Sequence, residues 1–334
     1  MSGYKHGGEK KMVAKVITVR GEIEPKELGF CQTHEHLYIS GGSASKIYPA
    51  LLIDDPEKSL VDAVAYIDAG GCSVVDALPV FAGRSATILK QISEKSGVHV
   101  IASTGFHRLM WYSEGSRLFQ LDEEALTEIY TREIEEGMVD EEFYSGSFEY
   151  TDIRAGQIKT ALESDFTYIY KKMFNAAAKT SLKTGVPIMI HVEKGSDPLM
   201  LLRFLTDLGI APEKQIYCHL DRAIPDIDIH KELIREGAYL EYDTIVRPKY
   251  RSHESEVELI LEMLDMGLED RVLISLDTTR TRLRGYGGVP GLDYLIKKFI
   301  PELKERGVSG DVIDKIFIKN PAALYAVLRT RGAQ

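Results

Sequence analysis

Eight short apolar runs, each followed by a helix-like stretch, constrain the fold of this chain more than any other feature. Several are rich in β-branched residues and apolar almost throughout, which is typical of strands covered on both faces of a parallel sheet. Eight strands that alternate with helices predict an α/β fold, a closed (β/α)8 TIM barrel. The expected strands span residues 29–37, 73–78, 99–105, 156–162, 187–193, 215–221, 239–245 and 272–277.

Amphipathic segments between these strands predict the helices, and several carry start or stop signals. Asp197-Pro198 opens one helix, and a glycine follows four others. A doubly wound open sheet is the alternative fold, but no GxGxxG or GxxxxGK[ST] motif follows any strand. The expected helices span residues 57–69, 84–96, 164–184, 197–208, 226–236, 253–266 and 290–306, and the four glycines are Gly185, Gly209, Gly237 and Gly267.

The ends of the chain complete the predicted barrel. Residues 15–24 are expected to form a small hairpin across the barrel bottom, and residues 309–328 to form terminal helices. Residues 1–11 are interpreted as a disordered N-terminal extension, with Met12 as an alternative start. Because α/β barrels often exceed 250 residues as one unit, residues 12–334 are expected to form a single domain.

Composition excludes several classes of protein. No run approaches the roughly 20 apolar residues that span a bilayer, and no apolar segment follows the first basic residues, so we expect a cytoplasmic protein. The three cysteines, Cys31, Cys72 and Cys218, lie in apolar runs and predict free thiols in a reducing compartment. The net charge of −10 makes nucleic acid and anionic membranes poor partners. An acidic run over 122–142 is expected to be a solvated helix with its connection.

Metal-capable side chains recur where the predicted strands end. His34 and His36 are two residues apart on one strand, so both imidazoles can reach the same metal ion. His191, His219 and Asp277 close three other strands, at the end where barrel active sites form. Each residue alone is equally typical of a core histidine or a helix cap. As a set on strands 1, 5, 6 and 8, they predict a metal site.

Lys159 is an anomaly within the expected strand GQIKTAL. A lysine inside a buried strand must be paired, neutral or chemically modified, since an isolated buried ammonium is heavily penalised. A neutral lysine amine can add CO2 to give a carbamate, whose two oxygens are able to bridge two metal ions. Lys159 is therefore a candidate bridging ligand.

This ordered set of residues, HxH, K, H, H and D, resembles the phosphotriesterase family of the amidohydrolase superfamily. The similarity runs from about residue 16 to the end and includes GFCQTHEHL, GAYLEYDT and KNPAALY. The resemblance implies a buried metal held by His34, His36 and Asp277 and an exposed one held by His191 and His219, with carboxylated Lys159 and a hydroxide between them. Two zinc ions are the default, with manganese or cobalt as alternatives. Asp277 would be the catalytic proton carrier.

Two basic clusters point to an anionic substrate. One spans 247–251, after strand 7, and the other spans 280–286, after strand 8, so both should lie on the rim of the site. In the phospho-furanose lactonase branch of the family, a loop-7 lysine and an arginine after the strand-8 aspartate grip the phosphate, and Lys249 and Arg280 match them. The branch's tyrosine is replaced by Leu283, although Tyr286 or Tyr250 could supply the hydroxyl.

The resemblance therefore implies a hydrolase that opens a lactone of the pentono-1,4-lactone 5-phosphate type, by attack of the metal-bridging hydroxide. One alternative is an acyl-lactonase that also hydrolyses neutral phosphotriesters, and another is a non-catalytic ligand-binding barrel. The expected partner is a small anionic molecule, and the sequence allows a homo-oligomer. Trp111 and His107 follow strand 3 and could either line the pocket or pack within a long loop.

Overall fold

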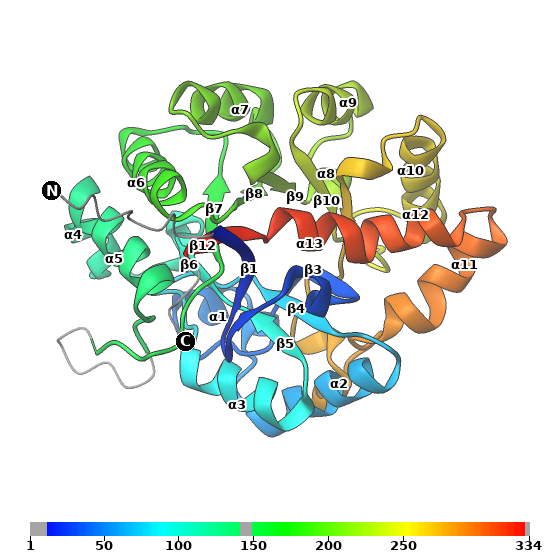
Figure 1. The fold of residues 1–334 in the computed structure, drawn as a ribbon, viewed down its shortest axis with the longest axis horizontal. Coiled ribbons are helices and arrows are strands. Elements are labelled where there is room, and N and C mark those ends of the chain that lie inside the picture. The colour runs from blue at the N-terminus through cyan, green and yellow to red at the C-terminus, as the bar shows by residue number, and fades with distance from the viewer. Residues whose placement is uncertain (1–11, 141–148, 331–334) are drawn as a thin grey trace, which may run out of the picture.

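A closed ring of parallel strands forms the centre of the protein (Figure 1). We describe it from a computed structural model, in residues 12–140 and 149–330; the extension over 1–11 lies outside these described residues. The expected strand over 99–105 is split into two parts, so that nine segments occupy eight barrel positions and the TIM barrel is confirmed. The segments are β3 (Cys31–Glu35), β4 (Ser73–Asp76), β5 (His99–Ile101), β6 (Ser103–Gly105), β7 (Gln157–Leu162), β8 (Ile188–Val192), β9 (Gln215–Cys218), β10 (Tyr239–Tyr242) and β11 (Val272–Ile274).

The barrel closes at a seam between β11 and β3. The paired strands run from β3 to β5 and from β6 to β11. At the seam, the Asp277 amide donates to the His34 carbonyl at 3.0 Å. The buried Glu35 carboxyl group accepts from the amides of Leu276 at 2.9 Å and Thr278 at 3.0 Å. Burial raises the pKa of Glu35 to about 8. The residue between the two histidines of the HxH motif therefore ties the ends of β3 and β11 together.

Helices surround the strands, and their ends follow the local signals in the sequence (Figure 1). Asp197 accepts from the Met200 amide at 2.9 Å with Pro198 in the first turn, and Gly185 ends α6 at a φ of 79°. The α-helices are α1 (Ser43–Ile47), α2 (Pro56–Asp68), α3 (Ala86–Ser96), α4 (Arg117–Gln120), α5 (Glu123–Glu135), α6 (Tyr168–Thr184), α7 (Pro198–Asp207), α8 (Leu220–Ala223), α9 (Ile227–Arg235), α10 (His253–Asp265), α11 (Ile300–Glu305), α12 (Gly310–Asp314) and α13 (Asn320–Leu324).

Short helical turns fill many of the connections. Among these turns, η3 and η7 contribute side chains to the cavity at the mouth of the barrel. The turns are η1 (Pro25–Leu28), η2 (Pro49–Leu51), η3 (Leu109–Trp111), η5 (Pro212–Lys214), η6 (Glu269–Arg271), η7 (Arg280–Arg282), η8 (Arg284–Tyr286), η9 (Leu295–Phe299) and η10 (Lys315–Lys319). None of the helices in the described parts of the chain combines the length and apolar character needed to cross a membrane.

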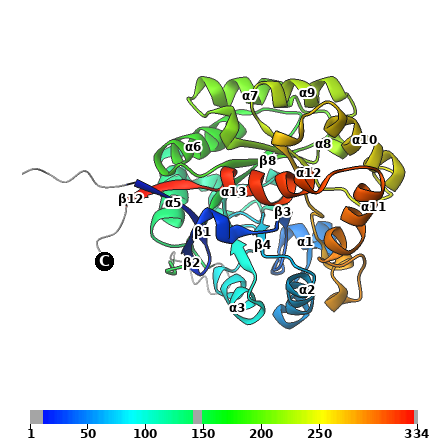
Figure 2. The ribbon, with the colours of Figure 1, turned by 45° about the vertical axis from the view of Figure 1, so that its right-hand side comes forward.

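The two ends of the described chain meet in a small antiparallel sheet, at the left of Figure 2. The expected hairpin is present as β1 (Met12–Thr18) and β2 (Gly21–Ile23), and the Val19 amide just after β1 donates to the Val100 carbonyl of β5. The expected terminal helices are present from Gly310, but they end at Leu324 and not at residue 328, and a strand, β12 (Val327–Thr330), follows and pairs with β1. Pairing satisfies backbone groups that an edge strand would expose, a non-local gain that the helical pattern does not reveal.

The barrel interior is apolar below and polar at its mouth. Alternation along the strands points Met189, Ile216 and Cys218 into a buried cluster that Tyr325, just after α13, also joins. The Tyr325 hydroxyl donates to Gln157 at 2.9 Å. The side chains at the mouth therefore lie above a buried apolar layer that fixes the strands carrying them. The cysteines are free thiols, as expected, although Cys72 is only half-buried and precedes β4.

The acidic helix α5 is not simply a solvated helix. Glu133 is fully buried, and its carboxylate pairs with the equally buried Arg84 guanidinium at 2.7 Å. Arg84 also donates to the Ser103 carbonyl of β6 at 2.6 Å. An isolated buried charge is costly, so this pair fixes α5 against the barrel. The expectation was wrong at this position because the partner of Glu133 is distant in the sequence.

Candidate metal centre

Four histidine side chains converge at the carboxyl-terminal mouth of the barrel. His34 lies in β3, His36 follows it, His191 lies in β8, and His219 follows β9. The ring centroids of His34 and His36 are 5.7 Å apart, those of His34 and His219 are 4.9 Å apart, and those of His191 and His219 are 4.4 Å apart. All four side chains are buried. The structure thus gathers the imidazoles that the sequence analysis selected.

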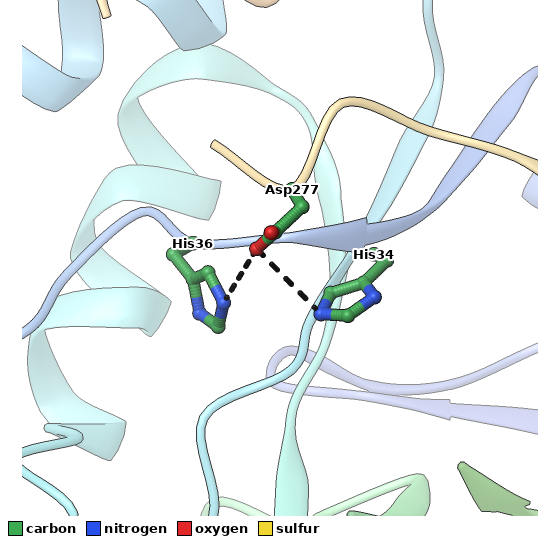
Figure 3. Close-up of side chains that lie close together, drawn as sticks. All are labelled: His34, His36 and Asp277. Carbon is green, nitrogen blue, oxygen red and sulfur yellow. Dashed lines mark ion pairs between the residues drawn. The ribbon is translucent and has the colours of Figure 1, made fainter. Parts of the chain in front are cut away.

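Asp277 faces His34 and His36 across this mouth (Figure 3). Its Oδ1 lies 3.5 Å from Nε2 of His36 and 3.8 Å from Nε2 of His34. The three side chains offer one ligand atom each, and these atoms lie within 4.8 Å of one another. A carboxylate and two imidazoles at this spacing are a ligand set for a divalent ion.

Two strands end earlier than expected, and the backbone turns sharply at the functional residue. The strand expected over 215–221 ends at Cys218, and the one expected over 272–277 ends at Ile274. His219 has a φ of 65° and Asp277 a φ of 50°, in the left-handed region that residues other than glycine rarely adopt. Such strain persists where the surroundings fix it, and here it occurs at two candidate ligands.

Lys159 contributes from β7, where it is fully buried. Its Nζ lies 3.1 Å from Nε2 of His34, the atom that also faces Asp277. Among the described residues, no carboxylate forms an ion pair with this lysine. Lys159 and Asp277 therefore both approach the same nitrogen of His34.

Asp243, which follows β10, supports two of the histidines and was not singled out from the sequence. Its Oδ1 lies 2.6 Å from Nδ1 of His219, and its Oδ2 lies 3.1 Å from Nδ1 of His34. Nδ1 can donate to a carboxylate while Nε2 keeps its lone pair for a metal ion. The alternation in YLEYD offered a signal, because it places Glu241 and Asp243 inside the barrel without a basic neighbour on the strand.

A second buried acid fixes Asp243 in turn. Asp221 accepts from the amides of Asp243 at 2.9 Å and Thr244 at 2.7 Å. Its other oxygen faces the buried carboxyl group of Glu256 on α10, and within the described chain no third group donates a hydrogen bond at this contact. Burial and the Asp221 carboxylate raise the pKa of Glu256 to about 10. Two carboxyl groups that face each other in this way share a proton, so Glu256 donates to Asp221.

The electrostatics of the site suit metal ligands. Burial lowers the pKa of His191 to about 3, and burial followed by nearby cations lowers the pKa values of His34 and His219 well below their usual range. Although burial acts to raise it, the Arg247 guanidinium and then His36 hold the pKa of Asp277 well below its usual range. Neutral imidazoles and an ionised carboxylate are the states that coordinate metals, so these residues fit a metal centre.

Two arginines of the predicted basic rim, Arg247 and Arg282, are buried, and their hydrogen bonds connect two adjacent loops. Arg247 Nη1 lies 3.0 Å from Asp277 Oδ2, and Nη2 donates to the Asp277 carbonyl. Arg282 donates in the opposite direction, to the carbonyls of Ile245 at 2.7 Å and Val246 at 3.1 Å. Arg222, after β9, also approaches Asp277 Oδ2, at 3.5 Å. Both arginines also line the cavity at the mouth, as expected of the rim, but Asp277 and loop carbonyls already engage their guanidinium groups.

A cavity of about 790 Å³ opens above these side chains. The candidate ligands His34, His36, His191, His219 and Asp277 line it. His107 and Trp111, which could have packed within their loop, line the cavity as well.

Of the predicted phosphate contacts, Lys249 lines the cavity. Arg280 lies beside it, with Nη1 3.3 Å from Asp54 Oδ1 and its guanidinium over the Tyr286 ring. The Tyr286 hydroxyl accepts from the Asp55 amide at 2.6 Å and donates to the Asp55 carbonyl at 3.0 Å.

Comparisons with known proteins agree with this geometry. The chain is 32% identical to a phospho-furanose lactonase from Mycoplasmopsis synoviae, over 92% of this chain and 91% of that protein. It is 30% identical to N-acetyltaurine hydrolase from Danio rerio, over 92% of this chain and 96% of that protein. The solved structure of a lactonase from Listeria monocytogenes superposes with a TM-score of 0.84 at 28% identity, over 95% of this chain and all of that chain.

A family model covers almost the whole described barrel. The model of the phosphotriesterase family matches residues 14–325, a range that contains every candidate metal ligand. The barrel fold, the converging histidines and the lactonase relatives lead to the same assignment. The chain therefore belongs to the phosphotriesterase family and is a metal-dependent hydrolase.

Proposed function

We propose that the protein opens the lactone ring of a phosphorylated sugar, of the pentono-1,4-lactone 5-phosphate type. The observation that carries this proposal is the charge of the cavity wall. In a chain with a net charge of −10, six cationic side chains line the cavity against two carboxylates. Such a concentration of positive charge favours an anionic substrate. The cations are Arg108, Lys194, Arg222, Arg247, Lys249 and Arg282, and the acids are Glu193 and Asp277.

Side chains from five barrel positions would hold two divalent ions. His34, His36 and Asp277 would bind one ion, His191 and His219 the other, and carboxylated Lys159 would bridge them. When bound, zinc, or alternatively manganese or cobalt, supplies Lewis acidity toward the lactone carbonyl and lowers the pKa of a nucleophilic water. The neutral imidazoles and the convergence of Lys159, His34 and Asp277 support this assignment.

Asp277 is the proposed proton carrier of the reaction. Because its pKa is held low, the side chain is an ionised acceptor at neutral pH. It can take the proton of the attacking water and deliver it to the ring oxygen that leaves as an alkoxide. Arg247 and Arg222 contact Oδ2 and keep the carboxylate oriented, while Oδ1 faces His34 and His36.

Lys249 is the proposed contact for the phosphate. It lies in the loop after β10, is exposed within the cavity, and stands 4.5 Å from the centroid of the Tyr250 ring. No ion pair engages it among the described residues, whereas Arg222 and Arg247 already contact Asp277. Arg280 and Tyr286, at the edge of the cavity, are proposed as further contacts for the phosphate.

A second candidate reaction is hydrolysis of an N-acyl amino sulfonate such as N-acetyltaurine. The similarity to N-acetyltaurine hydrolase is almost as high as that to the phospho-furanose lactonase, and the same cationic wall would suit a sulfonate. The chemistry would differ only in the leaving group, an amine in place of an alkoxide. The cationic wall disfavours the alternative of a neutral acyl lactone or phosphotriester.

One substrate panel separates these functions. Purified metal-loaded protein is offered aldonolactones with and without a 5-phosphate, N-acetyltaurine and a neutral acyl lactone, with a pH indicator for acid release and an amine assay for taurine. We expect the phosphorylated lactone to be hydrolysed with the highest kcat/KM. Preference for N-acetyltaurine would replace the lactonase proposal with the second candidate. Absence of hydrolysis across the whole panel would exclude both proposed substrate classes.

A further inference from the structure

Glu193 is a carboxylate among the cationic side chains that line the cavity. It directly follows β8 and, apart from the candidate metal ligand Asp277, is the one acidic side chain that lines the cavity within the described chain. Its Oε2 lies 2.5 Å from Nη1 of Arg108 and 3.4 Å from Nε2 of His191. Its Oε1 accepts from the Lys194 amide at 3.1 Å. The proposed reaction assigns no catalytic or binding role to Glu193.

Arg108 holds Glu193 in a fixed orientation. The Nε and Nη2 atoms of Arg108 lie 2.9 Å and 2.8 Å from Oε1 of Glu163, a residue that follows β7. The guanidinium also stands 5.8 Å from the centroid of the Trp111 ring. Arg108 is thus held independently by Glu163 and Trp111, so it preorganises the Glu193 side chain, which lowers the entropic cost of binding a ligand.

We propose that Glu193 accepts a hydrogen bond from a ring hydroxyl of the substrate, and so selects a hydroxylated anion over one without hydroxyl groups. This inference rests on the proposed function, because it concerns the sugar part of a phosphorylated lactone. A carboxylate repels the anionic part of a substrate, so a favourable contact between Glu193 and the ligand requires a hydrogen-bond donor elsewhere on the ligand. Sugar hydroxyls are such donors, and hydrogen bonds to charged groups are the stronger kind.

The hydrogen bond of His191 offers a competing explanation, in which Glu193 only positions that ligand. The two explanations differ in what a substitution changes. A positioning residue affects every substrate alike and alters metal retention, whereas a hydroxyl acceptor affects only ligands that carry the hydroxyl. Glu163 provides a matched control, because it pairs with the same Arg108 but does not line the cavity.

The test compares a phosphorylated pentonolactone with its deoxy analogues, each lacking one ring hydroxyl. Elemental analysis first establishes the metal content of the parent, Glu193→Ala, Glu193→Gln and Glu163→Gln proteins. Calorimetry then measures Kd for cyclic ethers that carry the phosphate and hydroxyls but lack the scissile carbonyl. Lactone hydrolysis by the same proteins gives kcat and KM separately, so that binding and turnover are compared for each ligand.

With metal content unchanged, Glu193→Ala should weaken binding of one hydroxylated ligand about tenfold to a hundredfold relative to its deoxy partner. Glu193→Gln, which keeps a carbonyl acceptor, should lose less, and Glu163→Gln should change both ligands by the same factor. Equal losses on every ligand, or loss of metal with Glu193→Ala, would overturn the inference. A parent that hydrolyses no lactone would overturn the proposed function, whereas selective loss of ether binding would still identify Glu193 as the hydroxyl acceptor.

Discussion

Asp243 and His219 form one of the shortest contacts in the metal centre, with Oδ1 2.6 Å from Nδ1. The other oxygen of Asp243 meets His34, a candidate ligand of the other metal ion. One carboxylate therefore orients an imidazole in each half of the proposed binuclear site. In that proposal, Asp243 would couple the two metal positions through its contacts with their ligands.

Replacement of Asp243 should consequently weaken both metal positions. We expect the parent protein to hold about two divalent ions per chain and Asp243→Ala to lose affinity roughly tenfold to a hundredfold. Competition with a chelator, followed by elemental analysis, measures this directly. Asp228→Ala on α9, where the side chain is exposed, is the matched control and should retain both ions. Parent-like metal retention by Asp243→Ala would contradict the coupling.

Lys159 should carry a carbamate in the metal-loaded protein, because it is buried beside His34 and has no carboxylate partner among the described residues. Lys159→Met keeps the side-chain volume but cannot be carboxylated, so the fold should survive and hydrolysis should be lost. Added acetate or propionate should restore part of the activity by supplying the missing oxygens. Mass and electron density that end at a bare amine in the metal-loaded protein would refute the bridge.

Asp277→Asn tests the proton carrier. The change removes the basic oxygen while keeping the shape of the side chain and its contacts with the neighbouring loop. Turnover should fall by roughly a hundredfold or more, the scale expected for loss of a general acid/base. The kcat of protein shown to hold both metals is the decisive measurement. A parent-like kcat would assign the proton transfer to another group.

Glu256 gives a prediction about stability and pH. Its pKa is about 10 in the folded protein and near 4.5 in an unfolded chain, so the folded state holds a proton that unfolding releases. The contribution of this group is fully present below the lower value and is lost as pH rises through the higher one. Glu256→Gln keeps a donor to Asp221 but does not titrate. The Tm of this variant minus the Tm of the parent should therefore increase as the pH rises.

Thermal melts of the metal-loaded proteins at about pH 5, 7 and 9 measure this difference. Glu254→Gln is the control, since Glu254 lies in the same helix but is exposed and pairs with Arg306 at 3.0 Å. Its Tm difference from the parent should not grow with pH. A constant or shrinking advantage of Glu256→Gln would show that Glu256 does not keep its proton in the fold.

The barrel and the convergence of these histidines and Asp277 at its mouth could be predicted because the evidence for them is local in the sequence. Apolar runs identify the strands, and a polar residue at the mouth end of such a run has few structural reasons to be there. His219 shows the limit of this reasoning, because the expected strand continued through it while the backbone in fact turns there at a φ of 65°. Strain that the surrounding structure imposes leaves no mark on hydropathy.

Contacts between distant loops explain the remaining differences. Arg247 and Arg282 look like solvent-exposed cations in the sequence, yet each is buried by carbonyl groups of the other's loop. Glu133 likewise becomes buried because Arg84 comes from another part of the chain. The sequence did not indicate Asp243 for the same reason, since its contacts are with two histidines from other strands.

The anion contact is the feature that separates the proposed lactonase from a hydrolase of neutral esters. Lys249 is exposed within the cavity, while Arg280 would have to leave Asp54 and the Leu52 carbonyl, each 3.3 Å from its Nη1, to reach a ligand there. Lys249→Ala should therefore cost about 1.5 to 3 kcal/mol with a phosphorylated lactone, or roughly tenfold to a hundredfold in kcat/KM. Arg280→Ala should cost less, and neither change should affect the unphosphorylated lactone. Equal losses on both lactones would mean that these residues support the fold or the metals, and the phosphate contact would have to be sought elsewhere on the cationic wall.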